Sequence, residues 1–369
     1  MNWIIPALRC CLAFGLCQQV AFAQPLPTTP QQWYAHWITH PQASADGFGV
    51  YYFQKTIQLP GVPAQCVVHL SGDNRYTFFV NGREVAEGPA RSDLMHWPYE
   101  TVDIAPYLQP GTNVLAARLV NYGPDRPFAQ HTHRTAFMLQ PQLATDTALA
   151  TGSSWLSVHD KAYHPIAISH ELARGYYVAG PCDSVLLALH RADWQQPQAA
   201  GTDWLPARRL VAARPFGKNE AEGWQLVART IPAMERRKEY LQQVRRSTLP
   251  VPGGWLQGKA PLTIPAGQTV QLLLDHDSLT IGYFHTRLSG GKGSRIKITY
   301  SEALYDSTGH KGNRNEVAGK KILGYYDVLV PDGRQQPVDI GTLWLRTFRF
   351  VQLDITTADE PLQLHELYN

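Results

Sequence analysis

Short stretches in which apolar and polar residues alternate recur along the chain, and they predict strands. The first occupies residues 50–59 and ends at Pro60-Gly61. Similar runs, rich in β-branched and aromatic residues, follow at 66–71, 75–80, 113–120 and 136–139. Turn residues separate these runs at intervals of roughly eight to twelve residues, a spacing typical of a β-sandwich or barrel. Residues 32–145 are therefore predicted to form one sandwich.

The strongest turn signal in this region is Asn81-Gly82, which lies between the strand-like runs 75–80 and 83–86. Both residue types tolerate the positive φ angles that a type I′ turn requires. We therefore predict a β-hairpin with a two-residue turn at this point.

Residues 146–232 follow a less regular pattern, and an apolar stretch at 184–190 fits either a helix or a strand. We interpret this part as a continuation of the first sandwich that packs on its flank, so the first domain is predicted to span 32–232. A basic run at 233–246 fits a solvated strand or short helix between two domains, and a nucleic-acid or membrane patch is the alternative. With the turn-rich residues 250–254 it forms a predicted linker, 233–254.

Alternation returns in the predicted second domain, residues 255–369. Strand patterns lie at 269–275, 282–288 and 295–300, and the longest occupies 343–355. Its length is typical of a large, curved antiparallel sheet of the jelly-roll or concanavalin type. One face of this strand is predicted to be apolar and the other to carry Arg346 and Arg349. The predicted fold class is all-β, with two antiparallel sandwiches in tandem.

Composition agrees with many short strands and turns. The 369 residues include 29 Gly and 27 Pro, and aromatic residues make up 11%. This length suggests two or three domains. The formal net charge of +3 gives no concentrated basic face of the kind that nucleic-acid binding needs.

The first 23 residues are predicted to be a signal peptide that is cleaved after Ala23. An apolar, small-residue run follows Arg9, and Ala21-Phe22-Ala23 supplies the cleavage pattern. A membrane anchor would need about 20 apolar residues, and Gln18 and Gln19 interrupt this run. The protein is therefore expected to be secreted or periplasmic, with no membrane span. Three of the five cysteines lie in the leader, so Cys66 and Cys182 leave one possible disulfide.

Few residues in the sequence suggest a binding or catalytic site. The loop at 309–316 is polar and glycine-rich, and such loops can present amide, guanidinium and carboxylate groups to sugar hydroxyls. The alternative is an ordinary exposed loop. Trp97, Tyr99 and Tyr122 suit stacking on a pyranose, with core packing as the alternative. Glycoside hydrolysis needs two convergent carboxyl groups, and no spacing shows that any of four candidates converge: Glu302, Asp306, Glu316 and Asp327.

The sequence contains only weak indications of a metal-binding site. His131 and His133 share one face of a strand, with Asp125 as the nearest further ligand. The sequence Asp275-His276-Asp277 suggests a Ca²⁺ or proton-transfer cluster, although its side chains alternate between faces. We therefore expect no metal or other cofactor, with Ca²⁺ as the one alternative. No nucleophile elbow or phosphate-binding loop is present.

Several motifs, taken in order, resemble the non-catalytic domains of bacterial α-L-rhamnosidases, a glycoside hydrolase family. The resemblance covers nearly the whole chain after the leader, and it rests on the order of the motifs because each one alone is weak. They lie at 72–82, 96–97, 102–108, 110–115, 121–123, 175–181, 231–235, 289–293, 300–304, 311–316 and 343–349.

The resemblance implies a sandwich similar to carbohydrate-binding modules, then a concanavalin-like domain, then an (α/α)₆ barrel that holds the catalytic carboxylates. This sequence has no long amphipathic helices and ends at Asn369, where the family continues into the barrel. No catalytic residue is therefore carried over. In the family the 311–316 loop and the 344–349 strand are expected near the barrel, and the candidate glycan contacts are Lys311, Asn313, Arg314, Asn315, Glu316, Trp344, Arg346 and Trp97.

The leading hypothesis is a non-catalytic portion of a secreted rhamnosidase, which binds rhamnose-containing glycans and supports a barrel on a separate domain or polypeptide. Two alternatives remain open. The chain could hydrolyse α-L-rhamnosides by itself, with Glu302 and either Glu316 or Asp327, or it could be a structural or adhesive surface module.

Overall fold

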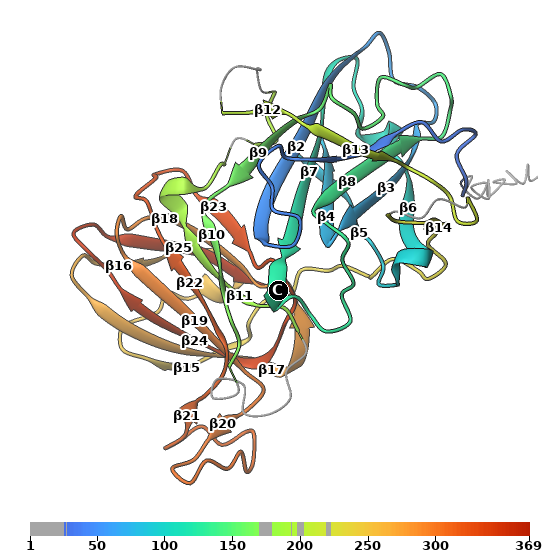
Figure 1. The fold of residues 1–369 in the computed structure, drawn as a ribbon. Coiled ribbons are helices and arrows are strands. Elements are labelled where there is room, and N and C mark those ends of the chain that lie inside the picture. Colours follow the sequence, from blue (N-terminus) through green and yellow to red (C-terminus); the bar gives the residue numbers. More distant parts are fainter. Residues whose placement is uncertain (1–25, 27, 170–178, 193, 198–202, 219–222) are drawn as a thin grey trace, which may run out of the picture.

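A computed structural model describes residues 26, 28–169, 179–192, 194–197, 203–218 and 223–369. The fold is all-β, as predicted, and consists of two sandwiches side by side (Figure 1). Within the described ranges, helical structure is confined to 3₁₀ turns: η1 (Leu94–His96), η2 (Ala105–Tyr107), η3 (Gly123–Asp125), η4 (Leu187–Leu189) and η5 (Trp255–Gln257). None of the helical segments in these ranges has the length and hydrophobicity of a membrane span. The predicted signal peptide lies outside the described residues.

The first sandwich contains two six-stranded sheets. One has the order β13-β1-β8-β3-β6-β14, with β1 (His36–Thr39), β3 (Val67–Asp73), β6 (Trp97–Asp103), β8 (Ala136–Pro141), β13 (Arg208–Ala212) and β14 (Leu226–Ala228). The other has the order β12-β9-β2-β7-β4-β5, with β2 (Phe48–Leu59), β4 (Arg75–Val80), β5 (Arg83–Gly88), β7 (Gly111–Tyr122), β9 (Leu156–Asp160) and β12 (Leu205–Pro206).

Alternation along these strands builds the core between the two sheets. Phe53 and Phe78 from one sheet and Phe137 from the other are fully buried in a single apolar cluster. Strands β2 and β7 pair in continuous register from Phe48 opposite Tyr122 to Leu59 opposite Gly111. The predicted hairpin at Asn81-Gly82 is confirmed, because β4 pairs with β5 and the two turn residues have φ angles of 51° and 75°.

The second sandwich has a seven-stranded and a four-stranded sheet. The larger has the order β10-β11-β22-β19-β24-β17-β15, with β10 (Tyr163–Ile166), β11 (Cys182–Leu186), β15 (Gln243–Ser247), β17 (Thr269–Gly282), β19 (Arg295–Ser301), β22 (Tyr326–Val330) and β24 (Arg346–Thr356). The smaller has the order β16-β25-β18-β23, with β16 (Leu262–Ile264), β18 (His285–Gly290), β23 (Val338–Gly341) and β25 (Leu362–Tyr368).

The segment 146–232 contributes strands to both sandwiches. Strands β9, β12, β13 and β14 extend the sheets of the first one. Strands β10 and β11, however, join the edge of the seven-stranded sheet, where β11 pairs in parallel with β22. The stretch 184–190, which fits helix or strand by sequence, ends β11 and continues into η4. The boundaries 32–232, 233–254 and 255–369 remain a prediction; β15 lies inside the predicted linker.

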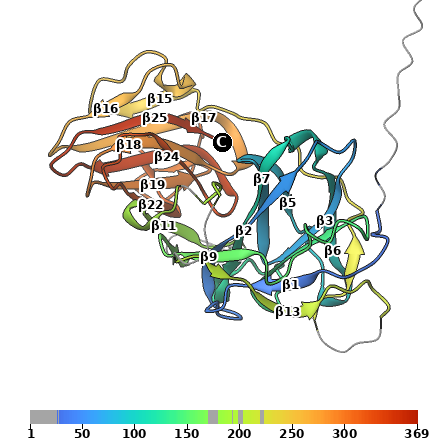
Figure 2. The same cartoon turned by 90° about the horizontal axis from the view of Figure 1, so that it is seen from above.

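One apolar cluster runs from the first sandwich into the second. It includes Val50 and Tyr122 on β2 and β7, Val185 on β11, and Phe348 and Val351 on β24. Figure 2 shows the two bodies in contact along this junction. Because a shared apolar interface resists relative motion of domains, we expect the two sandwiches to keep one fixed orientation. Cys66 and Cys182 are both buried and free, so the structure contains no disulfide between them.

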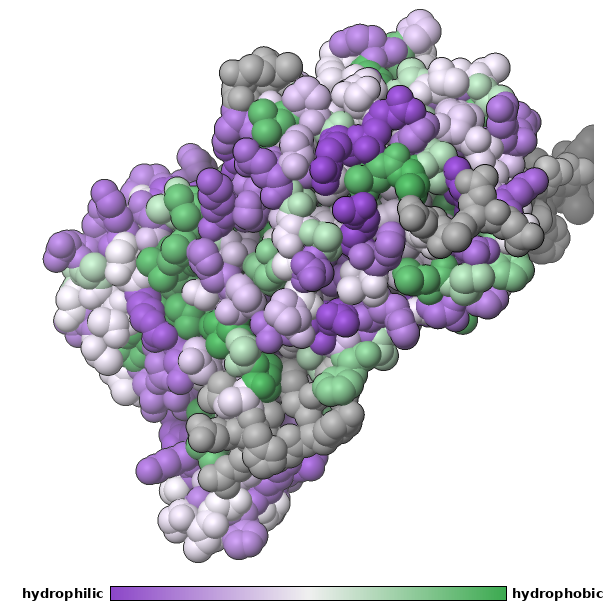
Figure 3. Space-filling model, viewed as in Figure 1, coloured by the Kyte–Doolittle hydropathy of each residue, from purple (hydrophilic) through white to green (hydrophobic). Residues whose placement is uncertain are grey.

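A small two-stranded sheet projects from the second sandwich at the end away from the first (Figure 1). It consists of β20 (Leu304–Tyr305) and β21 (Lys321–Ile322), and the loop between them holds the candidate residues 311–316. We call this projection, residues 304–322, the tip. Figure 3 shows mainly polar and neutral residues on the tip.

Candidate functional site

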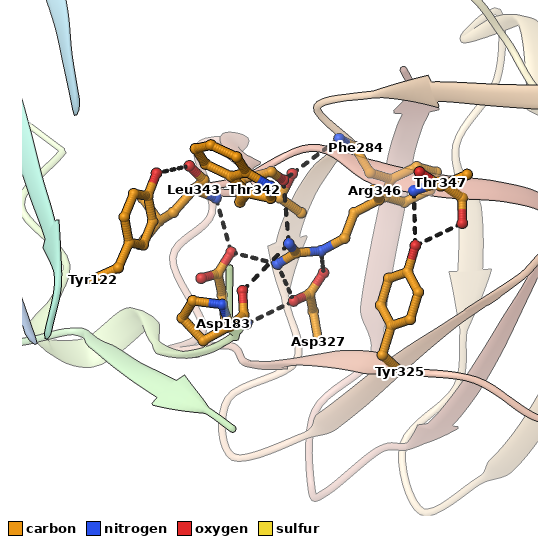
Figure 4. Close-up of polar contacts among 11 residues, drawn as sticks. Tyr122, Asp183, Phe284, Tyr325, Asp327, Thr342, Leu343, Arg346 and Thr347 are labelled. Atoms are coloured by element: carbon orange, nitrogen blue, oxygen red, sulfur yellow. Dashed lines mark hydrogen bonds and ion pairs between the residues drawn. The ribbon is translucent and has the colours of Figure 1, made fainter. Parts of the chain in front are cut away.

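A buried ion-pair network lies beside the junction of the two sandwiches (Figure 4). The guanidinium group of Arg346 donates to Asp327 from Nε (3.0 Å) and Nη2 (2.7 Å), and Nη2 also contacts Asp183 (2.9 Å). The Arg346 side chain is fully buried, and the two aspartates are nearly so. Buried charges of this kind are tolerated only when they are paired and hydrogen-bonded. Strands β11, β22 and β24 are therefore held together by charge as well as by apolar packing.

The same network connects the two sandwiches. The Asp183 carboxylate accepts the backbone N–H of Leu343 (2.8 Å), and the Leu343 carbonyl accepts the hydroxyl of Tyr122 on β7 (2.6 Å). Two carboxylates share one arginine, so ionisation of both would leave one negative charge uncompensated. Burial raises the pKa of Asp183 to about 7, although Arg346 opposes the shift. The pKa of Arg346 is raised, because Asp327 and Asp183 outweigh its burial.

We expect the free energy of unfolding to fall as pH rises from about 4 to 7. In that window the native protein keeps the Asp183 proton, whereas the unfolded chain has lost it, since the ordinary pKa is 3.8. Above about pH 7 both states are ionised and this contribution is constant. Urea unfolding of the wild type and of Asp183→Asn at several pH values measures the contribution of Asp183 to the free energy of unfolding. Between about pH 4 and 7 the free energy of unfolding should fall less steeply with pH in the Asn variant than in the wild type. Parallel curves for the two proteins would show that Asp183 does not have a raised pKa.

A cleft of about 830 Å³ opens next to this network, between the two sandwiches. Its walls come from β5, β6 and the segment 228–236 on one side, and from Tyr283, Trp344 and Leu345 on the other. Trp344 is held edge-to-face against Tyr122 with ring centroids 5.4 Å apart, and it is only 4% exposed. The ion-pair network thus fixes Arg346 at the start of β24. Trp344 lies two residues before Arg346 and is thereby held in the lining of the cleft.

Two arginines lie over the Trp344 ring. The guanidinium carbon of Arg91 is 5.1 Å from the ring centroid, and that of Arg75 is 5.7 Å away. Arg75 is fixed by a hydrogen bond to the carbonyl of Pro89 (3.0 Å). An indole face attracts a guanidinium through its quadrupole, so Trp344 orients both cations toward the cleft.

Glu100 supplies a buried carboxylate on the opposite wall. It accepts the hydroxyl of Tyr76 (2.7 Å), the N–H of Ala90 (3.0 Å) and the Arg229 guanidinium (3.1 Å), and its burial raises its pKa. Gly88 makes room for it, because a Cβ at this position would lie 2.1 Å from the Glu100 carboxylate. The cleft therefore combines fixed acceptors and donors with the apolar surface of Ala86, Met234 and Leu345.

The tip presents the candidate loop far from this cleft. Lys320, which is buried, donates to the carbonyls of Lys311 (3.0 Å) and Asn313 (2.7 Å), and this ammonium organises the loop from inside. Arg245 holds the carbonyl of Asn315 (3.2 Å). Arg314, Asn315 and Glu316 are exposed, and none of residues 311–316 lines the cleft. The structure therefore does not bring the loop together with Trp344.

Other candidates lie in the interior. Trp97 is 2% exposed and packs against Trp224, so the core-packing alternative describes it. Tyr99 and Tyr122 are likewise buried, and Tyr99 also lines the cleft. Both oxygens of Asp327 are engaged by Arg346, which leaves this carboxylate inaccessible to a substrate.

The prediction that Arg346 and Arg349 share a polar face is wrong. Arg346 lies over Tyr300 in the main cluster, whereas Arg349 lies beside Phe350 of a separate small cluster and pairs with Asp275 (3.0 Å). Residues three apart on a strand point to opposite sides. Ion pairing, rather than solvent exposure, accommodates both charges.

Metal-binding signals have little support in the described ranges. No group of three or more His, Cys, Asp or Glu side chains there is arranged to hold an ion. His133 packs edge-to-face on Trp224, and Asp275 is engaged by Arg349 and Arg245. The weak Ca²⁺ signal at 275–277 thus coincides with an ion-pair site.

Sequence reasoning missed most of the cleft. Arg75 falls inside the motif at 72–82, but its charge gives no hint of a partner at position 344. Arg91, Glu100 and Arg229 carry no recognisable pattern, because the cleft assembles them from segments far apart along the chain. Of the residues that the sequence suggested as sugar contacts, the cleft includes Trp344 and Tyr99.

The architecture and cleft define an all-β protein of two joined sandwiches, and the comparisons give its structural relatives. No protein-family model and no curated protein matches the chain. Among solved structures, the GH78-family rhamnosidase of Bacillus sp. GL1 matches 92% of this chain with a TM-score of 0.74 and 14% identity. The α-L-rhamnosidase of Aspergillus terreus matches 92% with a TM-score of 0.61 and 16% identity. That of Dictyoglumus thermophilum matches 89% with a TM-score of 0.58 and 16% identity.

At these identities the similarity establishes the fold. The chain has a rhamnosidase-like fold over about nine-tenths of its length. It spans 55%, 37% and 35% of the Bacillus, Aspergillus and Dictyoglumus chains, respectively.

Proposed function

We propose that the chain is a non-catalytic portion of a secreted α-L-rhamnosidase-like glycoside hydrolase. It binds rhamnose-containing glycans and supports a catalytic barrel supplied by another domain or polypeptide. The observation that carries the proposal is the rhamnosidase-like fold, which covers 92% of this chain but 55% of the Bacillus enzyme. An exported location, through the predicted signal peptide, is part of the proposal.

The cleft at Trp344 is the proposed glycan site. Sugar hydroxyls need donors and acceptors on a rigid base, and the Glu100–Arg229 pair and Arg75 provide them. Rhamnose is a 6-deoxy sugar, so its methyl group needs an apolar contact. Met234, which is 48% exposed, and Ala86 and Leu345 on the cleft wall offer that contact.

The proposed docking surface for a catalytic domain is a second hollow beside the cleft, with a volume of about 990 Å³. Leu279 and Ile281 on β17 lie here with exposures of 50% and 62%, and Asn369 also lines the hollow. Exposed apolar groups of this size favour burial against a partner. Met234 lines both hollows, so a domain docked here would lie next to the glycan site.

Binding without hydrolysis is the expected result of the direct test. Isothermal titration of the purified chain with methyl α-L-rhamnoside should show a dissociation constant in the millimolar range (about −4 kcal/mol). The matching L-mannoside, which differs by a 6-hydroxyl, should bind more weakly because its hydroxyl meets an apolar wall. The chain alone should not hydrolyse an aryl α-L-rhamnoside.

The other outcomes separate the alternatives. Hydrolysis that Glu316→Gln abolishes would replace this proposal with a self-sufficient rhamnosidase. Absence of binding to every rhamnoside, even at tens of millimolar, would leave the structural or adhesive module.

A further inference from the structure

The charges that line the cleft do not balance. Its arginines are Arg75, Arg91, Arg229 and Arg236, and its carboxylates are Glu84, Glu87 and Glu100. Each carboxylate already has a partner. Glu100 pairs with Arg229 (3.1 Å), and Arg236 pairs with Glu84 and also with Glu87 (3.3 Å). One cation is therefore in excess.

Arg91 is that cation. It forms no ion pair with any carboxylate of the described residues, and its contact is the face of Trp344. Its backbone follows Ala90, whose N–H is tied to Glu100 (3.0 Å), so the residue is anchored at its base. The Arg91 side chain remains exposed to the cleft. The Arg91 guanidinium is thus held in place while its positive charge has no carboxylate partner among the described residues.

Arg75 adds a second positive charge at the same place. Both guanidinium groups lie over one indole ring, and the carboxylate of Glu87 is 4.0 Å from Arg75 and is shared with Arg236. Burial and the charge of Arg75 lower the pKa of Arg91. Two like charges held together repel each other, and an anion placed between them removes that repulsion. The arrangement therefore favours an anionic ligand over a neutral one.

We propose that Arg91, held over Trp344 beside Arg75, binds the carboxylate of a uronic acid in the glycan. This inference rests on the proposed function, and it narrows the ligand class to acidic rhamnose-containing glycans. A planar guanidinium can donate two parallel N–H···O bonds to a carboxylate, which fixes the orientation of the sugar in addition to pairing its charge. The neighbouring rhamnose would then lie along the apolar wall at Met234 and Leu345.

The test compares two disaccharides by isothermal titration: rhamnosyl-galacturonate and rhamnosyl-galactose, in which CH₂OH replaces the carboxylate. The wild-type chain should bind the acidic disaccharide about tenfold more tightly, as expected for one charge-assisted pair. Arg91→Gln should remove this preference and leave the affinity for rhamnosyl-galactose within about twofold. Added salt should shrink the wild-type preference.

Arg83→Gln is the matched control. Arg83 also lies over an aromatic ring, with its guanidinium carbon 4.9 Å from the centroid of Tyr107, but it does not line the cleft. This variant should keep the full preference for the acidic disaccharide. Loss of the preference in Arg83→Gln would show that overall charge, rather than the cleft, produces it, and would overturn the inference.

The remaining outcomes are distinguishable. Equal wild-type affinity for the two disaccharides, or a preference that survives Arg91→Gln, overturns the carboxylate site and leaves the proposed function standing. Failure to bind either disaccharide overturns the proposed function itself. Displacement of rhamnosyl-galacturonate by inorganic sulfate at equal ionic strength, as effectively as by free galacturonate, also overturns the assignment, because the site would then accept anions in general.

Discussion

Replacing Arg346 with Met should lower the free energy of unfolding by about 3–5 kcal/mol, the usual cost of removing one partner from a buried ion pair. Asp327 would lose two hydrogen bonds and Asp183 one, and both carboxylates are almost fully buried. Methionine is uncharged but fills much of the same volume, so the loss is mainly electrostatic. Urea unfolding followed by tryptophan fluorescence measures it.

The control for this substitution is Arg295→Met on the neighbouring strand β19. Arg295 is exposed and opposite Thr356, so its replacement should change the free energy of unfolding by no more than about 0.5 kcal/mol. If Arg346→Met changed the free energy of unfolding as little as this control does, the network in Figure 4 would not hold the second sandwich together.

The second large effect is expected for Asp73→Ala in the first sandwich. Asp73 is fully buried and accepts five hydrogen bonds, from the side chains of Asn74 (2.8 Å), Thr132 (2.7 Å) and Trp224 (2.9 Å) and from the N–H groups of His133 (2.6 Å) and Arg134 (3.2 Å). A buried donor left without an acceptor costs about 1–3 kcal/mol. The free energy of unfolding should therefore fall by about 3 kcal/mol or more.

Asp73→Ala should also change the near-ultraviolet circular dichroism. Trp224 stacks on Trp37 with ring centroids 4.0 Å apart, and it would lose the bond that orients its indole. Asp46→Ala, on an exposed turn, is the control and should leave both stability and spectrum nearly unchanged. An unchanged tryptophan signal in Asp73→Ala would mean that packing alone orients Trp224.

Local patterns predicted the strands well where neighbours in sequence decide the structure. The run at 50–59 lies within β2, and the Asn81-Gly82 turn has the expected positive φ angles, because each depends on a few adjacent residues. Neighbours in sequence do not decide which strands pair with one another. Whether β11 joins the first or the second sandwich depends on its pairing with β22, more than 140 residues further on.

The site was harder to predict for the same reason. Trp344 could be named from its motif, but the cleft also requires Arg75, Arg91 and Glu100, which only the tertiary fold brings near it. Alternation along residues 343–355 placed Arg346 on the face opposite the apolar one. Its burial depends on Asp183 and Asp327, and no alternation rule reveals those two partners.

The central claim is that the cleft at Trp344 binds an acidic rhamnosyl glycan, and a crystal structure of the chain with rhamnosyl-galacturonate tests it most directly. We predict that the disaccharide lies between the two sandwiches, with its carboxylate within hydrogen-bonding distance of the Arg91 guanidinium and the rhamnose methyl group near Met234. A disaccharide bound instead at the tip, against residues 311–316, would contradict this account.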